Sequence, residues 1–221
     1  MQRSNSVRAL ILLAPLALAS AASAQLRITE VNPAGSGNSP YAADWFEITN
    51  FGATDVDITG YRFDDNSNAF GSAVALTGVT SIPAGRSAIF LETAAPATLT
   101  SFLNTWFGSV ANASGGYILG SYSGSGVGLS TSGDAVNIFT SAGVLVTRVD
   151  FGAATTLPNV RTFENAGGLN NVTLSTLSTV GVNGAFTAAG STEVGSPFAV
   201  PSPAATALFA LAGLAGSRRR R

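Results

Sequence analysis

Short runs of strand-forming residues, separated by turn signals, make up most of the chain. β-branched and aromatic residues are concentrated in these runs, and sequences containing Asn, Pro and Gly interrupt them. Several short strands at fairly regular intervals are typical of a β-sandwich. The expected strands cover residues 26–31, 44–50, 56–63 and 86–92.

The strand expected at residues 44–50 has one clearly apolar face. Successive side chains of a strand point to opposite sides, so Phe46 and Ile48 share one side. The other side is mixed and carries Trp45, Glu47 and Thr49. The alternation of apolar and polar positions is therefore imperfect in this strand.

The clearest element is a hairpin late in the chain. Two runs rich in β-branched residues, 134–139 and 144–151, are joined by the short Gly-containing loop 140–143. One face of the second run carries Leu145, Thr147, Val149 and Phe151.

One internal stretch predicts a helix. Residues 96–107 place apolar side chains at positions i, i+3, i+4 and i+7, and these are Leu99, Phe102, Leu103 and Trp106. Residues 165–198 have a weaker pattern, with many glycines and a polar run at 174–179, and predict either an edge strand pair or a loose linker. We therefore expect an all-β fold, a β-sandwich spanning residues 25–198.

The first 24 residues have the layout of a secretory signal peptide. Arg3 and Arg8 precede an apolar run at residues 9–19, and Ala22 and Ala24 form a small-x-small cleavage site. The alternative is a membrane anchor, but the run is shorter than the roughly 20 apolar residues that a span requires. We predict export and cleavage after Ala24.

The last 23 residues, 199–221, combine a Pro-containing motif, an apolar segment at 204–216 and four terminal arginines. An apolar helix of this length would enter a membrane, and Arg residues at its end would resist translocation. Three other interpretations are a buried core helix, a nucleic-acid-binding tail and a permanent anchor. The arginines that would stop transfer are Arg218, Arg219, Arg220 and Arg221.

This tail resembles the PEP-CTERM sorting signal. The family motif Val-Pro-Glu-Pro corresponds to Val200, Pro201, Ser202 and Pro203, with Ser202 in place of Glu. The resemblance implies two processing partners, signal peptidase and an exosortase-like membrane protease. It also implies transient membrane contact through the C-terminal helix.

Charge is distributed unevenly along the chain. All 11 basic residues are arginines, two of them in the leader and four in the tail, so five arginines remain in the body beside all 12 acidic residues. The body therefore carries a net charge of −7. Nucleic-acid backbones require clustered Lys and Arg, so we expect no nucleic-acid partner.

Asp44, Trp45, Glu47 and Asn50 form a conspicuous pattern in the body, an acidic residue and Trp followed by Glu and Asn at fixed spacing. On this pattern, which is Glu-Trp-x-Glu-x-x-Asn in the family, the body resembles a lamin-tail domain, and the resemblance implies an immunoglobulin-like sandwich. Further matching positions are Gly60 and Tyr61, the turn Ser132-Gly133-Asp134, and the closing residues 193–198. The segments that carry the resemblance are ITEVNP at 28–33, DWFEITNFG at 44–52, VDITGYRFDD at 56–65, IPAGRSAIFL at 82–91 and LSTSGDAVNIF…GVLVTRVDFG at 129–152.

Structural roles are expected for these matched residues. The large rings of Trp45 and Tyr61 should be buried in the core. Glu47 and Asn50 should satisfy local backbone groups at the end of their strand. Asp134 should tighten its turn through a side-chain hydrogen bond.

The residue types that are missing exclude most catalytic machinery. The chain has no His, Cys or Lys. Ser-His-Asp and Cys-His catalysis, the usual zinc sites and Walker phosphate loops are therefore excluded. We expect no catalytic residue and no cofactor, although carboxylate chemistry stays open.

The densest acidic stretch is a weak candidate for a cation site. Asp64, Asn66 and Asn68 occupy the first, third and fifth positions of a calcium loop. The loop motif fails because Ala69 and Ala75 replace the required Gly and Glu. A looser oxygen-ligand site or a solvated loop are the two alternatives.

Three functional hypotheses follow. The first is an exported, envelope-sorted sandwich that acts as a non-catalytic binding or structural module, with exopolysaccharide or a surface protein as its partner. The second is a carboxylate- or metal-dependent extracellular hydrolase. The third is a surface protein that stays anchored in the membrane through its tail.

Overall fold

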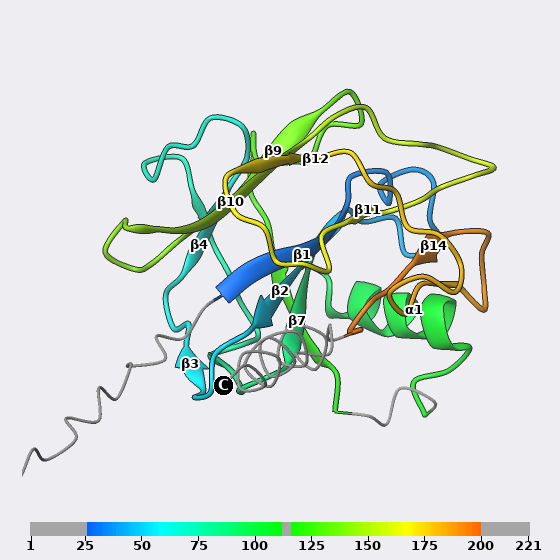
Figure 1. The fold of residues 1–221 in the computed structure, drawn as a ribbon, viewed down its shortest axis with the longest axis horizontal. Coiled ribbons are helices and arrows are strands. Elements are labelled where there is room, and N and C mark those ends of the chain that lie inside the picture. The colour runs from blue at the N-terminus through cyan, green and yellow to red at the C-terminus, as the bar shows by residue number, and fades with distance from the viewer. Residues whose placement is uncertain (1–25, 112–115, 200–221) are drawn as a thin grey trace, which may run out of the picture.

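Two five-stranded sheets face each other in the computed structural model, which describes residues 26–111 and 116–199 (Figure 1). In spatial order, the first sheet contains β11 (Phe163–Glu164), β1 (Leu26–Asn32), β2 (Trp45–Asn50), β7 (Ser87–Glu92) and β8 (Ile118–Tyr122). The second contains β12 (Val172–Leu174), β10 (Leu145–Phe151), β9 (Asp134–Phe139), β4 (Arg62–Asp64) and β5 (Val74–Ala75). The predicted all-β sandwich is confirmed.

The main core lies between the two sheets. Phe46 of β2 and Phe63 of β4 approach each other from opposite sheets, with ring centroids 4.9 Å apart. Tyr122 of β8 packs against both rings, at 5.3 Å and 4.5 Å. Because the chain has no disulfide, these buried aromatic side chains carry much of the stabilisation.

A second apolar cluster lies on the outer face of the first sheet, beneath helix α1 (Pro96–Phe107). The helix has the predicted bounds, and the side chains of Phe102 and Trp106 are buried against Trp45. Strand β2 is therefore covered on both faces, Trp45 by the helix and Phe46 by the second sheet. This double burial explains the imperfect alternation of its sequence.

The predicted hairpin is confirmed as β9 and β10, which pair antiparallel. Gly143 closes the loop in the left-handed region, with φ of 82°, and donates its amide to the carbonyl of Thr140. The register shifts between Leu145 and Thr147, so Leu145 is exposed while Thr147, Val149 and Phe151 are buried.

Residues 165–198 form part of the sandwich, so the loose-linker alternative is wrong. β12 is the edge strand of the second sheet and runs parallel to β10. β13 (Phe186–Thr187) pairs with β14 (Val194–Gly195), and Figure 1 shows β14 on the same side of the first sheet as α1. A second short pair joins β3 (Val56–Asp57) to β6 (Ser81–Ile82).

Tyr61 departs from the expectation that it would be buried like Trp45. It precedes β4 and is only partly buried against the main core, whereas Trp45 is fully buried. Tyr61 lies between the turn at residues 59–60 and the strand, and part of the residue still meets solvent.

The predicted signals at the two ends lie outside the described residues. These are the cleavage site at Ala22 and Ala24, the motif at residues 200–203 and the arginines at 218–221. Within residues 26–111 and 116–199, no helix has the length and apolar character needed to cross a membrane.

We predict that the strands after the hairpin are required for cooperative folding. A chain of residues 26–153 lacks one edge strand of each sheet and the buried side chains of Val160, Phe163 and Leu174. Each such side chain contributes about 1.5–3 kcal/mol through burial. Thermal unfolding followed by circular dichroism should show one sharp transition for residues 26–199 and none for residues 26–153. A sharp transition in the shorter chain, at a similar temperature, would contradict this.

Candidate functional site

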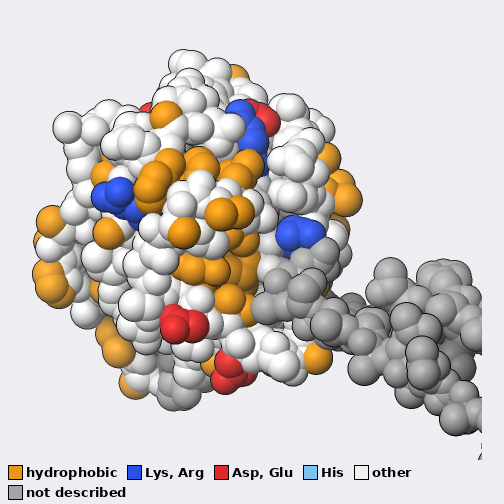
Figure 2. Space-filling view, turned by 90° about the vertical axis from the view of Figure 1, so that its left-hand side faces the viewer, with side chains coloured by type: hydrophobic (Ala, Val, Ile, Leu, Met, Phe, Trp, Pro, Cys, Tyr) orange, Lys and Arg blue, Asp and Glu red, His pale blue; other side chains and the backbone are white. Residues whose placement is uncertain are grey.

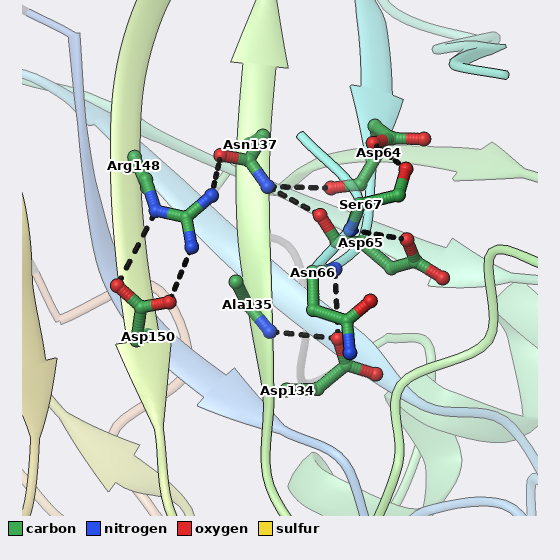
Figure 3. Close-up of polar contacts among 9 residues, drawn as sticks. All are labelled: Asp64, Asp65, Asn66, Ser67, Asp134, Ala135, Asn137, Arg148 and Asp150. Carbon is green, nitrogen blue, oxygen red and sulfur yellow. Dashed lines mark hydrogen bonds and ion pairs between the residues drawn. The ribbon is translucent and has the colours of Figure 1, made fainter. Parts of the chain in front are cut away.

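The predicted cation ligand Asp64 lies at the end of β4, on the outer side of the second sheet (Figure 3). Its side chain is buried, and both carboxylate oxygens accept hydrogen bonds. Oδ2 accepts from the Ser67 hydroxyl at 2.6 Å and the Ala69 amide at 2.7 Å, and Oδ1 accepts from the Ser72 hydroxyl at 2.9 Å. Asp64 thus organises the loop that follows it.

Asn66 and Asn68 contribute to this loop through their backbones. The Asn66 amide donates to Oδ1 of Asp134 at 2.9 Å, and the Asn68 amide donates to the carbonyl of Asp65 at 3.2 Å. Both side chains are exposed. No three acidic side chains within residues 26–111 and 116–199 are grouped closely enough to hold a metal ion.

A polar cluster next to this loop was not expected from the sequence. The buried amide of Asn137 donates to the carbonyls of Asp64 and Asp65, and its oxygen accepts from Arg148 at 2.7 Å (Figure 3). Arg148 also pairs with Asp150 two residues along β10, through Nη2 at 2.5 Å and Nε at 3.3 Å. The Arg148 and Asp150 side chains are 21% and 38% exposed, so part of the pair is available to a ligand.

Buried glutamates on the outer face of the first sheet form a second polar cluster. A β-bulge between Ile28 and Glu30 turns both Thr29 and Glu30 to this face. Glu30 is the cross-strand partner of Glu47 on one side and of Glu164 on the other. We call Glu164, Glu30 and Glu47 the glutamate row; their exposed fractions are 9%, 1% and 1%.

Hydroxyl and backbone N–H groups surround Glu30. Its Oε1 accepts from the Thr162 hydroxyl at 2.5 Å and from the Ser196 amide at 2.7 Å. Its Oε2 accepts from the Ser196 hydroxyl at 3.2 Å. The donors are thus neutral and come from the chain beyond the hairpin.

Glu47 closes a chain of hydroxyls that crosses three strands. Thr29 donates to Oε1 of Glu47 at 2.6 Å, Thr49 lies 2.8 Å from Thr29, and Ser87 lies 2.7 Å from Thr49. On the other side, Oε2 of Glu47 accepts the amide of Phe198 at 2.5 Å.

A fourth buried carboxylate, Glu193, lies beside the row. Its Oε1 accepts from Ser39 at 2.5 Å, Tyr41 at 2.8 Å and the side-chain amide of Asn32 at 3.2 Å. The phenol of Tyr41 in turn accepts from the indole of Trp45 at 3.0 Å, which links this carboxylate to the second apolar cluster.

Burial shifts the protonation of two members of the row, Glu30 and Glu47. Removal from water raises the pKa of Glu30 to about 7 and that of Glu47 to about 8. Neighbouring negative charge adds to both shifts, from Glu164 at Glu30 and from Glu30 at Glu47. The hydrogen bonds to the row lower these pKa values without offsetting burial.

The sequence matches the lamin tail domain family over residues 19–153, which is more than half of the chain. The chain belongs to the lamin tail domain family. No match was found among curated proteins or among solved structures. Lamin tail domains are immunoglobulin-like, non-enzymatic modules, and membership of this family favours a binding or structural role over a catalytic one.

The family pattern explains some residues and leaves others to the structure. Asn50 has the expected local role, since it donates to the carbonyl of Thr54 and accepts from the amide of Gly52. It also donates to the carbonyl of Ile82, 32 positions away. The expected role of Asp134 is also confirmed by its bonds to backbone amides in its turn. Glu47 needs a correction, because the backbone group that it satisfies belongs to Phe198, 151 positions away.

Only the position of two glutamates within short expected strands could have indicated the glutamate row from the sequence. Glu30 and Glu47 both stand in short strands of the lamin tail domain that are otherwise rich in buried side chains. The bulge and the pairing with β11 cannot be read from these runs, since both depend on partners distant in the sequence. Residues Thr162, Ser196 and Phe198 lie beyond the matched range.

We predict that Asp64 has a structural role in its loop. In Asp64→Asn an acceptor oxygen is replaced by an NH₂ group that faces other donors. The free energy of unfolding should therefore fall by about 1–3 kcal/mol. The matched variant Asp65→Asn should change stability by about 0.5 kcal/mol at most. Chemical denaturation measures both. A rise in melting temperature of the unmodified domain on adding Ca²⁺ would instead favour a cation site.

We also predict that the domain loses stability as pH rises. The pKa values of Glu30 and Glu47 are higher in the folded domain than the ordinary 4.5, so the folded state binds more protons. Their contribution to the free energy of unfolding is complete below about pH 4.5 and is lost as pH rises through about 8. Each carboxyl group contributes about 1.4 kcal/mol for each unit by which its pKa in the folded domain exceeds its pKa in the unfolded chain.

Denaturation at a series of pH values tests this in Glu47→Gln, which should show a shallower decline than the unmodified domain. Asp57→Asn, at a fully exposed position, is the control and should keep the original slope. If the unmodified domain gained stability between about pH 5 and about pH 8, the assignment of raised pKa values would be wrong.

Proposed function

We propose that this lamin tail domain protein is exported, sorted to the envelope by its tail, and acts at the cell surface or in the extracellular matrix as a non-catalytic binding or structural module. The support for its location is the leader at residues 1–24 and the Pro motif, apolar segment and arginines at 199–221. The support for its role is family membership.

One observation carries the non-catalytic part of this proposal. In a chain without His, Cys or Lys, the four most deeply buried carboxylates are used as hydrogen-bond acceptors inside the fold. Glu30, Glu47, Asp64 and Glu193 are all at most 1% exposed, and each holds hydroxyl or amide donors. A substrate would have to displace parts of the fold to reach them.

Two surface features support binding. The partly exposed Arg148–Asp150 pair offers planar hydrogen-bonding groups on the outer face of the second sheet, which suits the hydroxyls of an exopolysaccharide. Figure 2 shows a second feature, a band of hydrophobic side chains bordered by polar, mostly uncharged surface. Contiguous apolar surface of this kind favours a protein partner.

Processing is tested by intact-mass measurement of the native protein from envelope and medium. The proposal expects a mass that begins after Ala24 and ends near residues 200–203. A protein that keeps residues 204–221 in the membrane would favour permanent anchoring. Recovery from the cytosol with both ends intact would overturn the proposal.

Binding is tested with a glycan array on the domain and on two matched variants. If the polar pair contacts sugar, Asp150→Ala should weaken binding about tenfold. Asp57→Ala, at an exposed position on a different strand pair, should not. Binding to no glycan, together with capture of one surface protein, would favour the protein partner. Hydrolysis of the glycan, abolished by a single carboxylate substitution, would contradict a non-catalytic role.

A further inference from the structure

The last described residues of the chain are held to the body by the glutamate row. β14 anchors this segment through backbone pairing with β13 and through the bond from the Val194 amide to the carbonyl of Val160. Beyond β14, the hydrogen bonds described between residues 196–199 and the rest of the domain end on Glu30 and Glu47. We call residues 196–199 the latch.

The latch also covers the aromatic cluster beneath it. The ring of Phe198 lies 4.5 Å from Tyr117 and 6.5 Å from Phe102, centroid to centroid. Phe198 adopts a φ of 63°, a left-handed conformation that is strained for a bulky side chain. Ring packing and the bond to Glu47 hold Phe198 in this conformation while the latch is docked.

The chain entering the latch approaches the row very closely. A Cβ atom at Gly195 would lie 2.7 Å from Oε1 of Glu30 and 2.9 Å from the ring of Trp106. A side chain at this position would push the latch away from the carboxylates. The close approach of Gly195 therefore helps to keep Glu30 out of contact with water.

The acidic side chains around the latch come from several elements. Glu30, Glu47 and Glu164 come from β1, β2 and β11, and Glu193 lies just before β14. The donors described around these groups are hydroxyls, asparagine amides and backbone N–H groups, with no arginine among them.

The remaining neighbours of the latch add no compensating positive charge. Helix α1 has no charged residue, and Arg161, next to Thr162, donates to the carbonyl of Ser178. The phenol of Tyr41 stays neutral, because burial and the charge of Glu193 raise its pKa well above 10.

We propose that the latch is a pH-sensitive closure that docks while Glu30 and Glu47 hold protons and detaches when these two carboxyl groups ionise. A detached latch returns Glu30 and Glu47 to water, where carboxylates ionise near their ordinary pKa. The docked state therefore binds more protons, and rising pH shifts the equilibrium toward the open state. This inference does not depend on the proposed function.

Pulsed hydrogen–deuterium exchange on the full chain, corrected for the intrinsic exchange rate, tests the closure. Protection of a peptide covering residues 193–199 should fall about tenfold or more between about pH 5.5 and about pH 8.5. Peptides from β9 and β10 should keep their protection. Tryptophan emission should shift to the red in parallel, because both tryptophans of the chain lie in the cluster that the latch covers.

Three variants make the test specific. Glu30→Gln with Glu47→Gln removes the titrating groups and should give latch protection that no longer depends on pH. Asp57→Asn is the control and should follow the unmodified chain. Gly195→Ala should open the latch even at about pH 5.5, because its Cβ meets Glu30 and Trp106.

Latch protection that stays constant with pH in the unmodified chain would overturn the proposal. So would a fall in protection that persists in the double Gln variant. Loss of protection in β9 and β10 in step with the latch would also overturn it, since that result means global unfolding.

Discussion

Glu30 of β1 and Glu47 of β2 lie opposite each other on neighbouring strands, where both are almost completely out of contact with water. Buried carboxylates are costly unless donors replace the lost water. Here the donors are the hydroxyl groups of Thr29 and Thr162 and the backbone N–H groups of residues 196 and 198. The buried carboxylates of the first sheet therefore depend on residues 196–198 for part of their hydrogen bonding.

The second sheet uses the same solution. Asp64 and Asp134 are buried carboxylates that accept amides and hydroxyls from the loops beside them, and Asn137 ties those loops to β10 through Arg148. With five arginines and no lysine in the body, ion pairs cannot satisfy twelve acidic residues. The abundant Ser, Thr and Asn provide the donors instead.

Local patterns in the sequence were sufficient for the elements but not for their polar connections. The hairpin of β9 and β10 and the helix α1 depend on short-range periodicity and turn residues, and both were predicted with nearly correct bounds. The covering of β2 on both faces depends on α1, which lies about fifty residues later, and this hid the significance of Trp45 and Glu47. The weak pattern of residues 165–198 reflects very short strands that are held by side-chain and backbone bonds to distant partners.

Glu30 and Glu47 are protonated more readily than ordinary carboxyl groups because the latch, residues 196–199, helps to remove them from water. The most direct test is a ¹³C NMR titration of the side-chain carboxyl carbons in the full domain, with each signal assigned through Glu30→Gln and Glu47→Gln. The account predicts midpoints clearly above 4.5, near 7 for Glu30 and near 8 for Glu47. Midpoints at or below 4.5 for both would contradict it.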